Sequence, residues 1–153
     1  MRRLTLIAAA ALLLTACAQK RIADEGRQFD GDIWNRFTPE RFDIDVKDNE
    51  QLYNIDIEVA VDTAIFRYSQ MPFILELDSP EREHRQIFTG VELKQQGRWR
   101  GEADGRYRVV KGRIRSYFSF NHKGRHQLTI KQDTPQYDLE GIHSLRVIVE
   151  ASD

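Results

Sequence analysis

The sequence predicts an all-β protein, an antiparallel β-sandwich of jelly-roll or immunoglobulin-like type, and three observations carry that prediction. Apolar and polar residues alternate with a period of two over 42–46 and 53–61, which is typical of strands with one solvated face. Turn residues, such as those at 48–50, and prolines separate the apolar segments. No stretch longer than two turns has a helical period. A closed barrel is the structural alternative.

Short strands separated by turn signals continue to the end of the chain, which favours a sandwich over an α/β fold. We expect strands at 42–46, 53–61, 73–77, 88–93, 107–114, 117–120, 126–130 and 142–150. The segment 81–86 is predicted to be a charged loop, and the segment around Pro135 a second loop.

The first seventeen residues have the composition of a secretory signal peptide. Arg2 and Arg3 form a basic start, an apolar run follows, and small residues lead to Cys17, the only cysteine of the chain. The apolar run is too short to span a bilayer, which needs about 20 apolar residues. The ending Leu14-Thr-Ala-Cys17 resembles the bacterial lipobox, in which the cysteine thiol becomes a thioether to diacylglycerol and the chain is cut before it.

The resemblance to the lipobox implies that Cys17 carries acyl lipid, palmitate or a similar chain, and that no other cofactor is required. Each buried acyl CH₂ contributes roughly 0.8 kcal/mol, so two or three chains hold a protein on a membrane. Ala18, not Asp, follows Cys17, which by resemblance to Gram-negative sorting rules favours the outer membrane. The following residues match acidic surface-export signals poorly, so the periplasmic face is favoured over the cell surface.

Three segments are therefore predicted: a signal peptide at 1–16, a lipidated tether at 17–32 and a β-sandwich domain at 33–153. The tether is polar, contains two glycines and lacks periodicity; as a random coil it would span roughly 20 Å. Cleavage removes two arginines and changes the formal net charge from −1 to −3. That balance gives no electrostatic footprint for nucleic acid, so no nucleic-acid partner is expected.

Catalytic motifs are not evident in this sequence. No histidine pair has the helical spacing of a zinc protease, and a lipidated Cys17 is no nucleophile. The segment Gly101-Glu-Ala-Asp-Gly105 lacks the Lys-Ser/Thr of a phosphate-binding loop. An enzyme is therefore the third-ranked function class.

Acidic residues alternate along the first two predicted strands. If 42–46 and 53–61 pair as a hairpin, one face collects Asp43, Asp45, Asp56 and Glu58, oxygen ligands of the kind that calcium takes. A different pairing would place these acids opposite Arg113 and Arg115. A solvated face, or an edge protected by charge, explains the same pattern without a metal, and no metal is our expectation.

Aromatic residues suggest a ligand or partner surface. Trp99 lies between glycines in Gly97-Arg-Trp-Arg-Gly101, which indicates an unusual loop, and Tyr107 follows shortly. Aromatic faces stack on sugars, so these two residues are candidates for glycan or partner contact. The alternative is core packing, which aromatic residues dominate energetically, and which we favour for Trp34.

Several segments together resemble the gliding-motility lipoprotein H (GldH) family of the Bacteroidota. They are the lipobox, Trp34-Asn-Arg-Phe37, Tyr53-Asn-Ile-Asp-Ile-Glu-Val59, Met71-Pro-Phe-Ile-Leu75, Gly97-Arg-Trp-Arg-Gly101, Gly124-Arg-His-Gln-Leu-Thr-Ile-Lys-Gln132 and Leu139-Glu-Gly-Ile142. The resemblance implies an outer-membrane lipoprotein of the gliding and secretion machinery without known enzyme activity. Among functional residues, it carries over only the acylated Cys17.

The expected function is a lipid-anchored, non-enzymatic component or scaffold of a cell-envelope complex. Its partners would be the membrane, through the lipid, and other envelope or gliding-machinery proteins. The alternative is a carbohydrate-binding β-sandwich module on the outer membrane.

Overall fold

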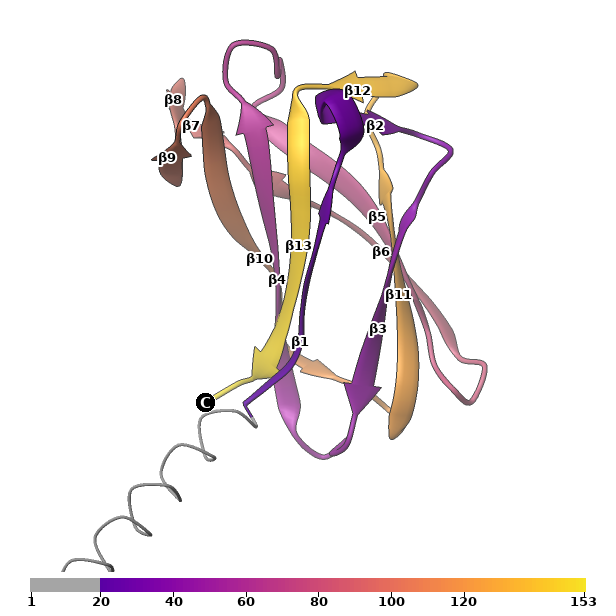
Figure 1. The fold of residues 1–153 in the computed structure, drawn as a ribbon. Coiled ribbons are helices and arrows are strands. Elements are labelled where there is room, and N and C mark those ends of the chain that lie inside the picture. Colours follow the sequence, from indigo (N-terminus) through magenta and orange to yellow (C-terminus); the bar gives the residue numbers. More distant parts are fainter. Residues whose placement is uncertain (1–19) are drawn as a thin grey trace, which may run out of the picture.

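The computed structural model describes residues 20–153, and the signal peptide and Cys17 lie outside the described residues. Two antiparallel sheets face each other in this part of the chain (Figure 1). Among the described residues, no helix is long and apolar enough to cross a membrane. The prediction of an all-β antiparallel sandwich is confirmed.

The first sheet has the strand order β1-β13-β4-β10-β9 and the second has the order β3-β11-β5-β6. Their bounds are β1 Arg21–Gln28, β3 Glu40–Val46, β4 Leu52–Asp62, β5 Gln70–Asp78, β6 His84–Glu92, β9 Glu102–Asp104, β10 Tyr107–Ser119, β11 Gly124–Gln132 and β13 Ile142–Ala151. Two small ladders pair β2 Ile33–Asn35 with β12 Asp138–Glu140 and β7 Lys94–Gln95 with β8 Arg98–Trp99. A single 3₁₀ turn, η1 Asp30–Asp32, follows β1.

The eight long strands follow the jelly-roll order. Counted along the chain, the first, eighth, third and sixth share one sheet, and the second, seventh, fourth and fifth share the other. Within residues 20–153 no ladder joins the two sheets, so the alternative of a closed barrel is wrong. The chain changes sheet at most turns, so strands that are neighbours in sequence are rarely paired.

The core lies between the two sheets and consists of the inward-facing residue of each alternating pair. Both sheets contribute fully buried side chains, among them Ile57, Leu145 and Val147 from the first and Phe42, Ile44, Phe73 and Leu128 from the second. Each such side chain contributes roughly 1.5–3 kcal/mol by leaving water. The period-two pattern of the sequence therefore identifies the core correctly along β3, β4 and β5.

Two strand boundaries differ from the prediction. The predicted strand 107–114 and residues 117–119 of the predicted strand 117–120 belong to the single strand β10, whose register against β4 shifts near Arg115 and again before Phe118. Tyr117 has a φ of +53° at this irregularity, which interrupts the alternation and mimics a strand end. The residues 84–86, predicted as loop, begin β6, because cross-strand pairing with β5 outweighs their polarity.

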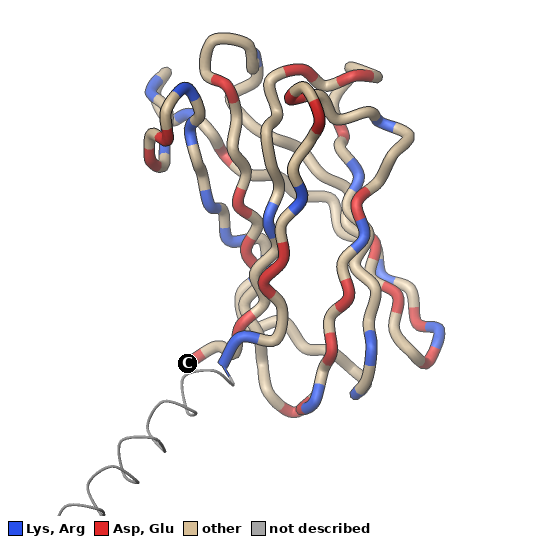
Figure 2. The backbone as a smooth tube through the Cα atoms, viewed as in Figure 1, with Lys and Arg blue, Asp and Glu red and all other residues tan. Residues whose placement is uncertain are grey.

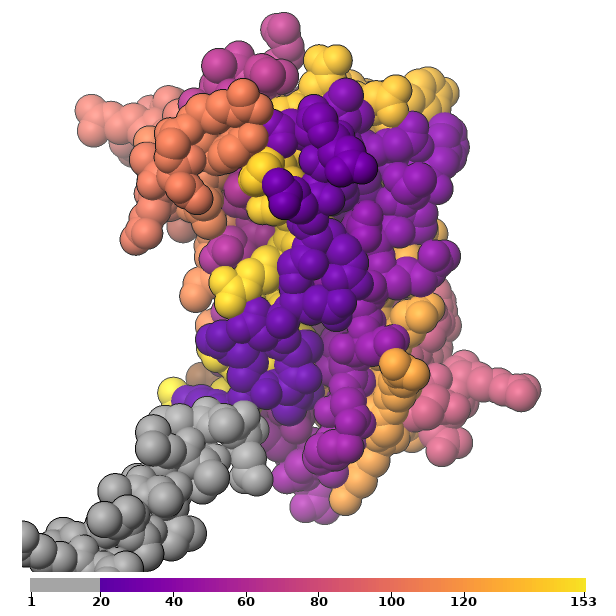
Figure 3. Space-filling view, viewed as in Figure 1, coloured from indigo at the N-terminus to yellow at the C-terminus, as the bar shows by residue number. Residues whose placement is uncertain are grey.

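The prediction of a flexible tether over 17–32 is wrong for the residues that the structure describes. Arg21–Gln28 form β1, which pairs with β13 along its whole length, and η1 packs directly after it. Figure 3 shows β1 filling the space between β13 and β3 on this face. As an edge strand, β1 has mostly exposed side chains, so backbone pairing holds it and its sequence shows no hydrophobic period. The domain begins at Arg21, not at residue 33.

Asp24 on β1 is bound by side chains from two directions. Arg146 of β13 donates two hydrogen bonds to its carboxylate, at 2.6 and 2.9 Å, and Arg21 donates one at 2.6 Å. The hydrogen bonds from Arg146 are the largest cause of a pKa of about 2 for Asp24, well below its ordinary value. The ionised carboxylate thus fastens β1 to its neighbour.

His126 of β11 is fully buried under the turn at the start of that strand. Its Nδ1 donates to the carbonyl of Gly124 at 3.2 Å, and its ring packs edge-on against Phe120. Among the described residues, its Nε2 is the one buried side-chain nitrogen or oxygen without a hydrogen-bond partner. Burial lowers the pKa of this imidazole, because the charged form has no solvation there.

We expect Asp24→Asn to reduce the free energy of unfolding at pH 7. The depressed pKa of Asp24 stabilises the folded state above the unfolded pKa of about 3.9, and this stability is lost as pH falls toward 2. Urea unfolding should therefore show a gap between wild type and variant at pH 7 that closes between about pH 4 and 2. Glu25→Gln, which removes an exposed ion pair to Arg27, is the control. An equal loss in both variants would contradict the prediction.

We expect His126→Leu to weaken the acid sensitivity of the fold. The unfolded imidazole binds a proton below about pH 6.5, whereas the buried one resists it, so wild-type stability declines as pH falls from 6.5. The variant should lose less free energy of unfolding between pH 7 and 5 than wild type does. Parallel pH profiles of the two proteins would show that the buried ring does not titrate as described.

Candidate interaction surface

The end of the sandwich opposite Arg21 carries an unusual amount of exposed apolar surface. This distal end consists of η1, β2, β12, the loop at 63–69 and the turn before β10 (Figure 1). Of the seven exposed large hydrophobic residues in the described part of the chain, four lie here: Ile33, Phe37, Ile65 and Tyr137. Apolar residues gathered at one end of a soluble domain mark a contact surface more often than scattered ones do.

A tight turn after β2 presents Phe37 to solvent. Trp34 anchors the turn: its ring is buried opposite Leu139 in the β2–β12 ladder, and its Nε1 donates to the Thr38 carbonyl at 2.9 Å. The Asn35 side-chain oxygen accepts from the Phe37 amide at 2.9 Å, and the Thr38 amide donates to the Asn35 carbonyl at 3.1 Å. These bonds fix the backbone that carries Phe37 before anything binds.

Phe37 and Tyr137 form an exposed aromatic pair. Their rings stack with centroids 5.7 Å apart and planes 24° from parallel, yet the two residues are 73% and 64% exposed. The Arg36 amide donates to the Tyr137 carbonyl at 2.7 Å, and the Arg36 guanidinium lies 5.9 Å from the Tyr137 ring centre. Beside the pair, the amide of Asn35 donates to the carboxylate of Asp138 at 2.7 Å. We call Arg36, Phe37 and Tyr137 the aromatic platform.

A network of hydrogen bonds around Asp32 joins the segments that form the distal end. His143 Nδ1 lies 2.6 Å from one carboxylate oxygen of Asp32 and donates to it, since an ionised carboxylate only accepts. The Tyr107 hydroxyl and the Arg106 guanidinium each donate to the other oxygen at 2.8 Å. The rings of Tyr107 and His143 stack with centroids 3.9 Å apart. Three separate segments, η1, β10 and β13, are thereby joined at one carboxylate.

The electrostatics of Asp32 reflect these partners. Burial favours the neutral acid, but the hydrogen bonds from His143, Tyr107 and Arg106 outweigh it and lower the Asp32 pKa. The second ring nitrogen of His143, Nε2, lies 3.3 Å from the Gln28 amide nitrogen. Both nitrogens of this histidine are thus engaged in the fold, so the network is a structural joint and offers no free base for catalysis.

A shallow cavity of about 260 Å³ lies between this network and the exposed apolar residues. Ile33 and Ile65 contribute apolar walls, and Arg106 and Glu140 contribute charge. Gly141 forms part of its floor with a φ of +83°, where a Cβ would come within 2.7 Å of the Phe66 backbone. The aromatic platform and this cavity flank the same short strand, β2.

Trp99 and Tyr107 do not form a common surface in the structure. Trp99 lies in β8, partly buried against the core, with the Lys94 ammonium 4.3 Å from its ring centre. Tyr107 is held in the Asp32 network, with its hydroxyl and one ring face occupied. Their predicted contact with a ligand or partner stays a prediction.

The hairpin on which the calcium hypothesis depended is wrong. β3, with Asp43 and Asp45, pairs with β11, whereas β4, with Asp56 and Glu58, lies in the other sheet. Each acid has a basic neighbour: Asp43 with Arg125, Asp45 with Lys47, Asp56 with Arg113 and Glu58 with Arg146. In residues 20–153 no group of three or more metal-binding side chains is present. The alternative pairing is confirmed for Asp56, which lies directly opposite Arg113.

Sequence reasoning missed Asp32 and the aromatic platform. The segment Trp34-Asn-Arg-Phe37 carries part of the family resemblance, and its central Asn is also a turn signal. Asp32 lies in Asp30-Gly-Asp, which is a turn signal, but this segment falls within the predicted tether. Tyr137 and His143 reach these residues only through the fold, and no local signal indicates it.

The fold is that of a jelly-roll domain, and its distal end carries an exposed aromatic surface on a hydrogen-bonded turn. The chain belongs to the GldH lipoprotein family, whose model matches residues 21–147. A comparison with curated proteins gave no match. One similar solved structure is a family GH115 4-O-methyl-α-glucuronidase with specificity for decorated arabinogalactans. It is 13% identical, with a TM-score of 0.42, over 86% of this chain and 17% of its own.

We expect Asp32→Asn to destabilise the domain by about 1–3 kcal/mol at pH 7, because buried hydrogen-bond partners lose a charged acceptor. The lowered pKa of Asp32 stabilises the fold above about pH 3.9, so the difference from wild type should shrink as pH falls below that value. Chemical unfolding at pH 7 and at low pH measures both effects. Asp30→Asn, at an exposed position of the same turn, should leave stability within about 0.5 kcal/mol; a comparable loss there would contradict the account.

Proposed function

We propose that this protein is a lipid-anchored, non-enzymatic component of a cell-envelope complex, and that its distal end binds a protein partner. Membership in the GldH lipoprotein family supports the anchor and the gliding-motility type of lipoprotein. The single observation that carries the partner contact is the aromatic platform, exposed yet held by a hydrogen-bonded turn.

Protein interfaces concentrate their binding energy in a few aromatic and arginine residues. The platform supplies one arginine, Arg36, and two aromatic residues, Phe37 and Tyr137. Its backbone is fixed by the Trp34 anchor, so little conformational entropy remains to be lost on binding. The adjoining cavity, with Ile33 and Ile65 in its walls, extends the apolar contact area.

The proposed location is the outer membrane, on its periplasmic face, with diacylglycerol on Cys17. The lipobox-like ending before Cys17 and the Ala that follows it support this location. The family type supports a role in gliding motility, and the proposal extends this role to protein secretion. The domain would then present the aromatic platform to an envelope protein of that machinery.

The non-enzymatic character is supported by the state of the polar groups. The polar cluster around Asp32 has its acceptors and donors bound to one another. A catalytic base must reach a substrate proton within about 2.6–3.2 Å, and the imidazole of His143 is already occupied on both sides.

A glycan is the second candidate ligand, and one observation favours it. The stacked rings of Phe37 and Tyr137 stand beside the amide of Asn35 and the carboxylate of Asp138, a combination of flat apolar faces and hydrogen-bonding groups that suits a sugar. Titration of a glycan panel followed by tyrosine and tryptophan fluorescence would test it, and flat curves would remove it.

We expect Phe37→Ala and Tyr137→Ala each to reduce recovery of the partner at least tenfold in cross-linking and affinity capture from native membranes. Each removes an exposed ring, so the free energy of unfolding should change by less than about 0.5 kcal/mol. Phe88→Ala is the matched control, because Phe88 is 66% exposed on β6, away from the distal end. Recovery of the partner at the wild-type level with both platform variants would contradict the proposal.

A further inference from the structure

The chain leaves the domain very close to the proposed anchor. β1 begins at Arg21, so only three residues, 18–20, separate it from Cys17. Four residue steps span at most about 14 Å when fully extended. This reach is shorter than β1 itself, whose eight residues rise about 24 Å. The Cα atom of Cys17, from whose side chain the proposed lipid extends, must therefore lie within about 14 Å of the start of β1.

The start of β1 is fixed to the rest of the domain. Arg21 pairs with Glu150 in the β1–β13 register, and the amide of Ala151 donates to the Lys20 carbonyl at 2.7 Å. The chain therefore emerges at one end of the sandwich, beside its C-terminus (Figure 1). We call this end the base; it comprises the start of β1, the turn at 47–51 and residues 152–153.

The surface of the base differs from that of the distal end. Two exposed large hydrophobic residues lie among the described residues of the base and its margin: Leu52, at 39%, and Tyr117, at 65%, two residues before the β10 partner of Leu52. Basic and acidic residues alternate there, as they do along most of the domain (Figure 2). The exposed side chains of Lys47 and Asp45 form an ion pair, in which Nζ and Oδ2 lie 2.5 Å apart. A charge-balanced surface with a tyrosine at its margin suits contact with a zwitterionic headgroup layer.

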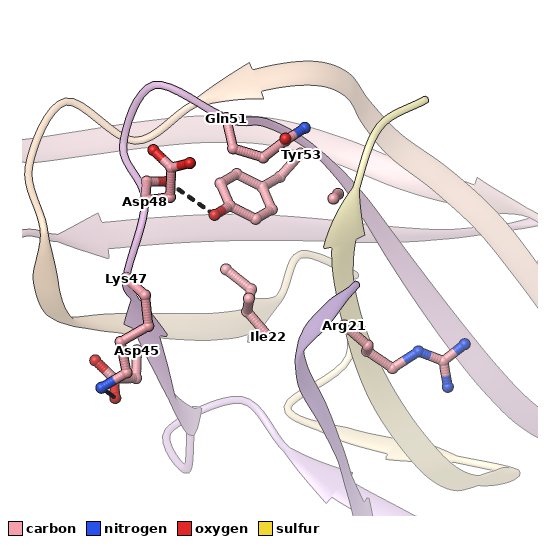
Figure 4. A pocket seen from close by; sticks show the side chains of 8 residues that line it. Arg21, Ile22, Asp45, Lys47, Asp48, Gln51 and Tyr53 are labelled. Atoms are coloured by element: carbon pink, nitrogen blue, oxygen red, sulfur yellow. Dashed lines mark hydrogen bonds and ion pairs between the residues drawn. The ribbon is translucent and has the colours of Figure 1, made fainter. Parts of the chain in front are cut away.

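A cavity of about 550 Å³ opens at the base between β1, the turn at 47–51 and the end of β13. Figure 4 shows Ile22 and Tyr53 pointing into it, whereas the Arg21 side chain turns away. Arg21 is occupied by Asp24 and Glu150. The cavity thus has apolar inner walls formed largely by two side chains.

Groups of both charges stand at the rim of this cavity. The Lys47 ammonium is the cation there, with its side chain 80% exposed. The carboxylates of Asp45 and Asp48 are the anions. The Asp48 carbonyl is fixed by the Tyr53 hydroxyl, which donates to it at 2.8 Å. A phospholipid headgroup carries a phosphate and, in phosphatidylethanolamine, an ammonium a few bonds away.

We propose that the base of the domain sits directly on the membrane and that its cavity takes the headgroup of a zwitterionic phospholipid. The headgroup takes the place of the ion pair between Lys47 and Asp45. Lys47 then binds the phosphate, Asp45 and Asp48 bind the ammonium, and the walls at Ile22 and Tyr53 cover the glycerol end. The inference rests on the proposed lipid anchor at Cys17. It orients the molecule with the aromatic platform pointing away from the bilayer.

Site-specific fluorescence tests this orientation in the full-length lipidated protein. Because Cys17 is the only cysteine and carries the lipid, a cysteine introduced by Glu50→Cys at the base or by Arg67→Cys at the distal end is a unique labelling site. The protein is reconstituted in phosphatidylethanolamine-rich vesicles that contain a lipid with a nitroxide on its headgroup. We expect quenching of the label at position 50 to exceed that at position 67 several-fold.

The headgroup contact has its own test in the same vesicles. Lys47→Glu should reduce quenching at position 50 by at least half, because the reversed charge repels phosphate. Lys111→Glu, the same charge change in the middle of β10, should leave it unchanged. Equal quenching at positions 50 and 67 would overturn the orientation, and equal effects of the two lysine variants would overturn headgroup binding.

Flotation of the vesicles separates these outcomes from a failure of the proposed function. Protein that floats with the vesicles is anchored, whatever its quenching pattern. Protein that does not float has no lipid anchor, and then the proposed function fails together with the inference.

Discussion

The pairing of β1 with β13 is the constraint on which the rest of the structure depends. This ladder runs from Arg21 to Gln28, and the bidentate contact between Arg146 and Asp24 reinforces it. β1 forms the edge of the first sheet, and the chain continues from it directly into η1. There, Asp32 accepts hydrogen bonds from side chains of β10 and β13. Without this ladder, the distal turn that carries Phe37 would have no fixed starting point.

The same ladder gives the molecule two ends with different surfaces. At the base, β1 begins four residues after Cys17, and the surface carries balanced charge. At the distal end, the surface is apolar and aromatic, and buried hydrogen bonds hold it. The aromatic platform lies about the length of one strand, about 24 Å, from the base of the domain. We interpret the protein as a short rigid spacer with a binding surface at its tip.

The sequence predicts much of the fold, because buried and exposed residues alternate along most core strands. Where a strand has one face in the core and one in water, as β3 and β4 do, the period of two reveals it. β1 escapes detection because the backbone of an edge strand can pair while its side chains stay polar. The hairpin prediction fails for a topological reason: in a jelly roll the chain crosses to the other sheet after β3, and alternation does not encode its pairing partner. The platform joins Phe37 to Tyr137, residues one hundred positions apart, and no local pattern links them.

Hydrogen exchange of the backbone amides of β1 in the full-length protein tests the central claim most directly. If β1 is an integral strand, those of its amides that face β13 should be protected to an extent approaching that of β4, which lies in the middle of the same sheet. Exchange of residues 21–28 at the rate of an unstructured peptide, with β4 protected, would contradict the account. The segment would then be a tether, and neither the short reach to the membrane nor the fixed distal turn would hold.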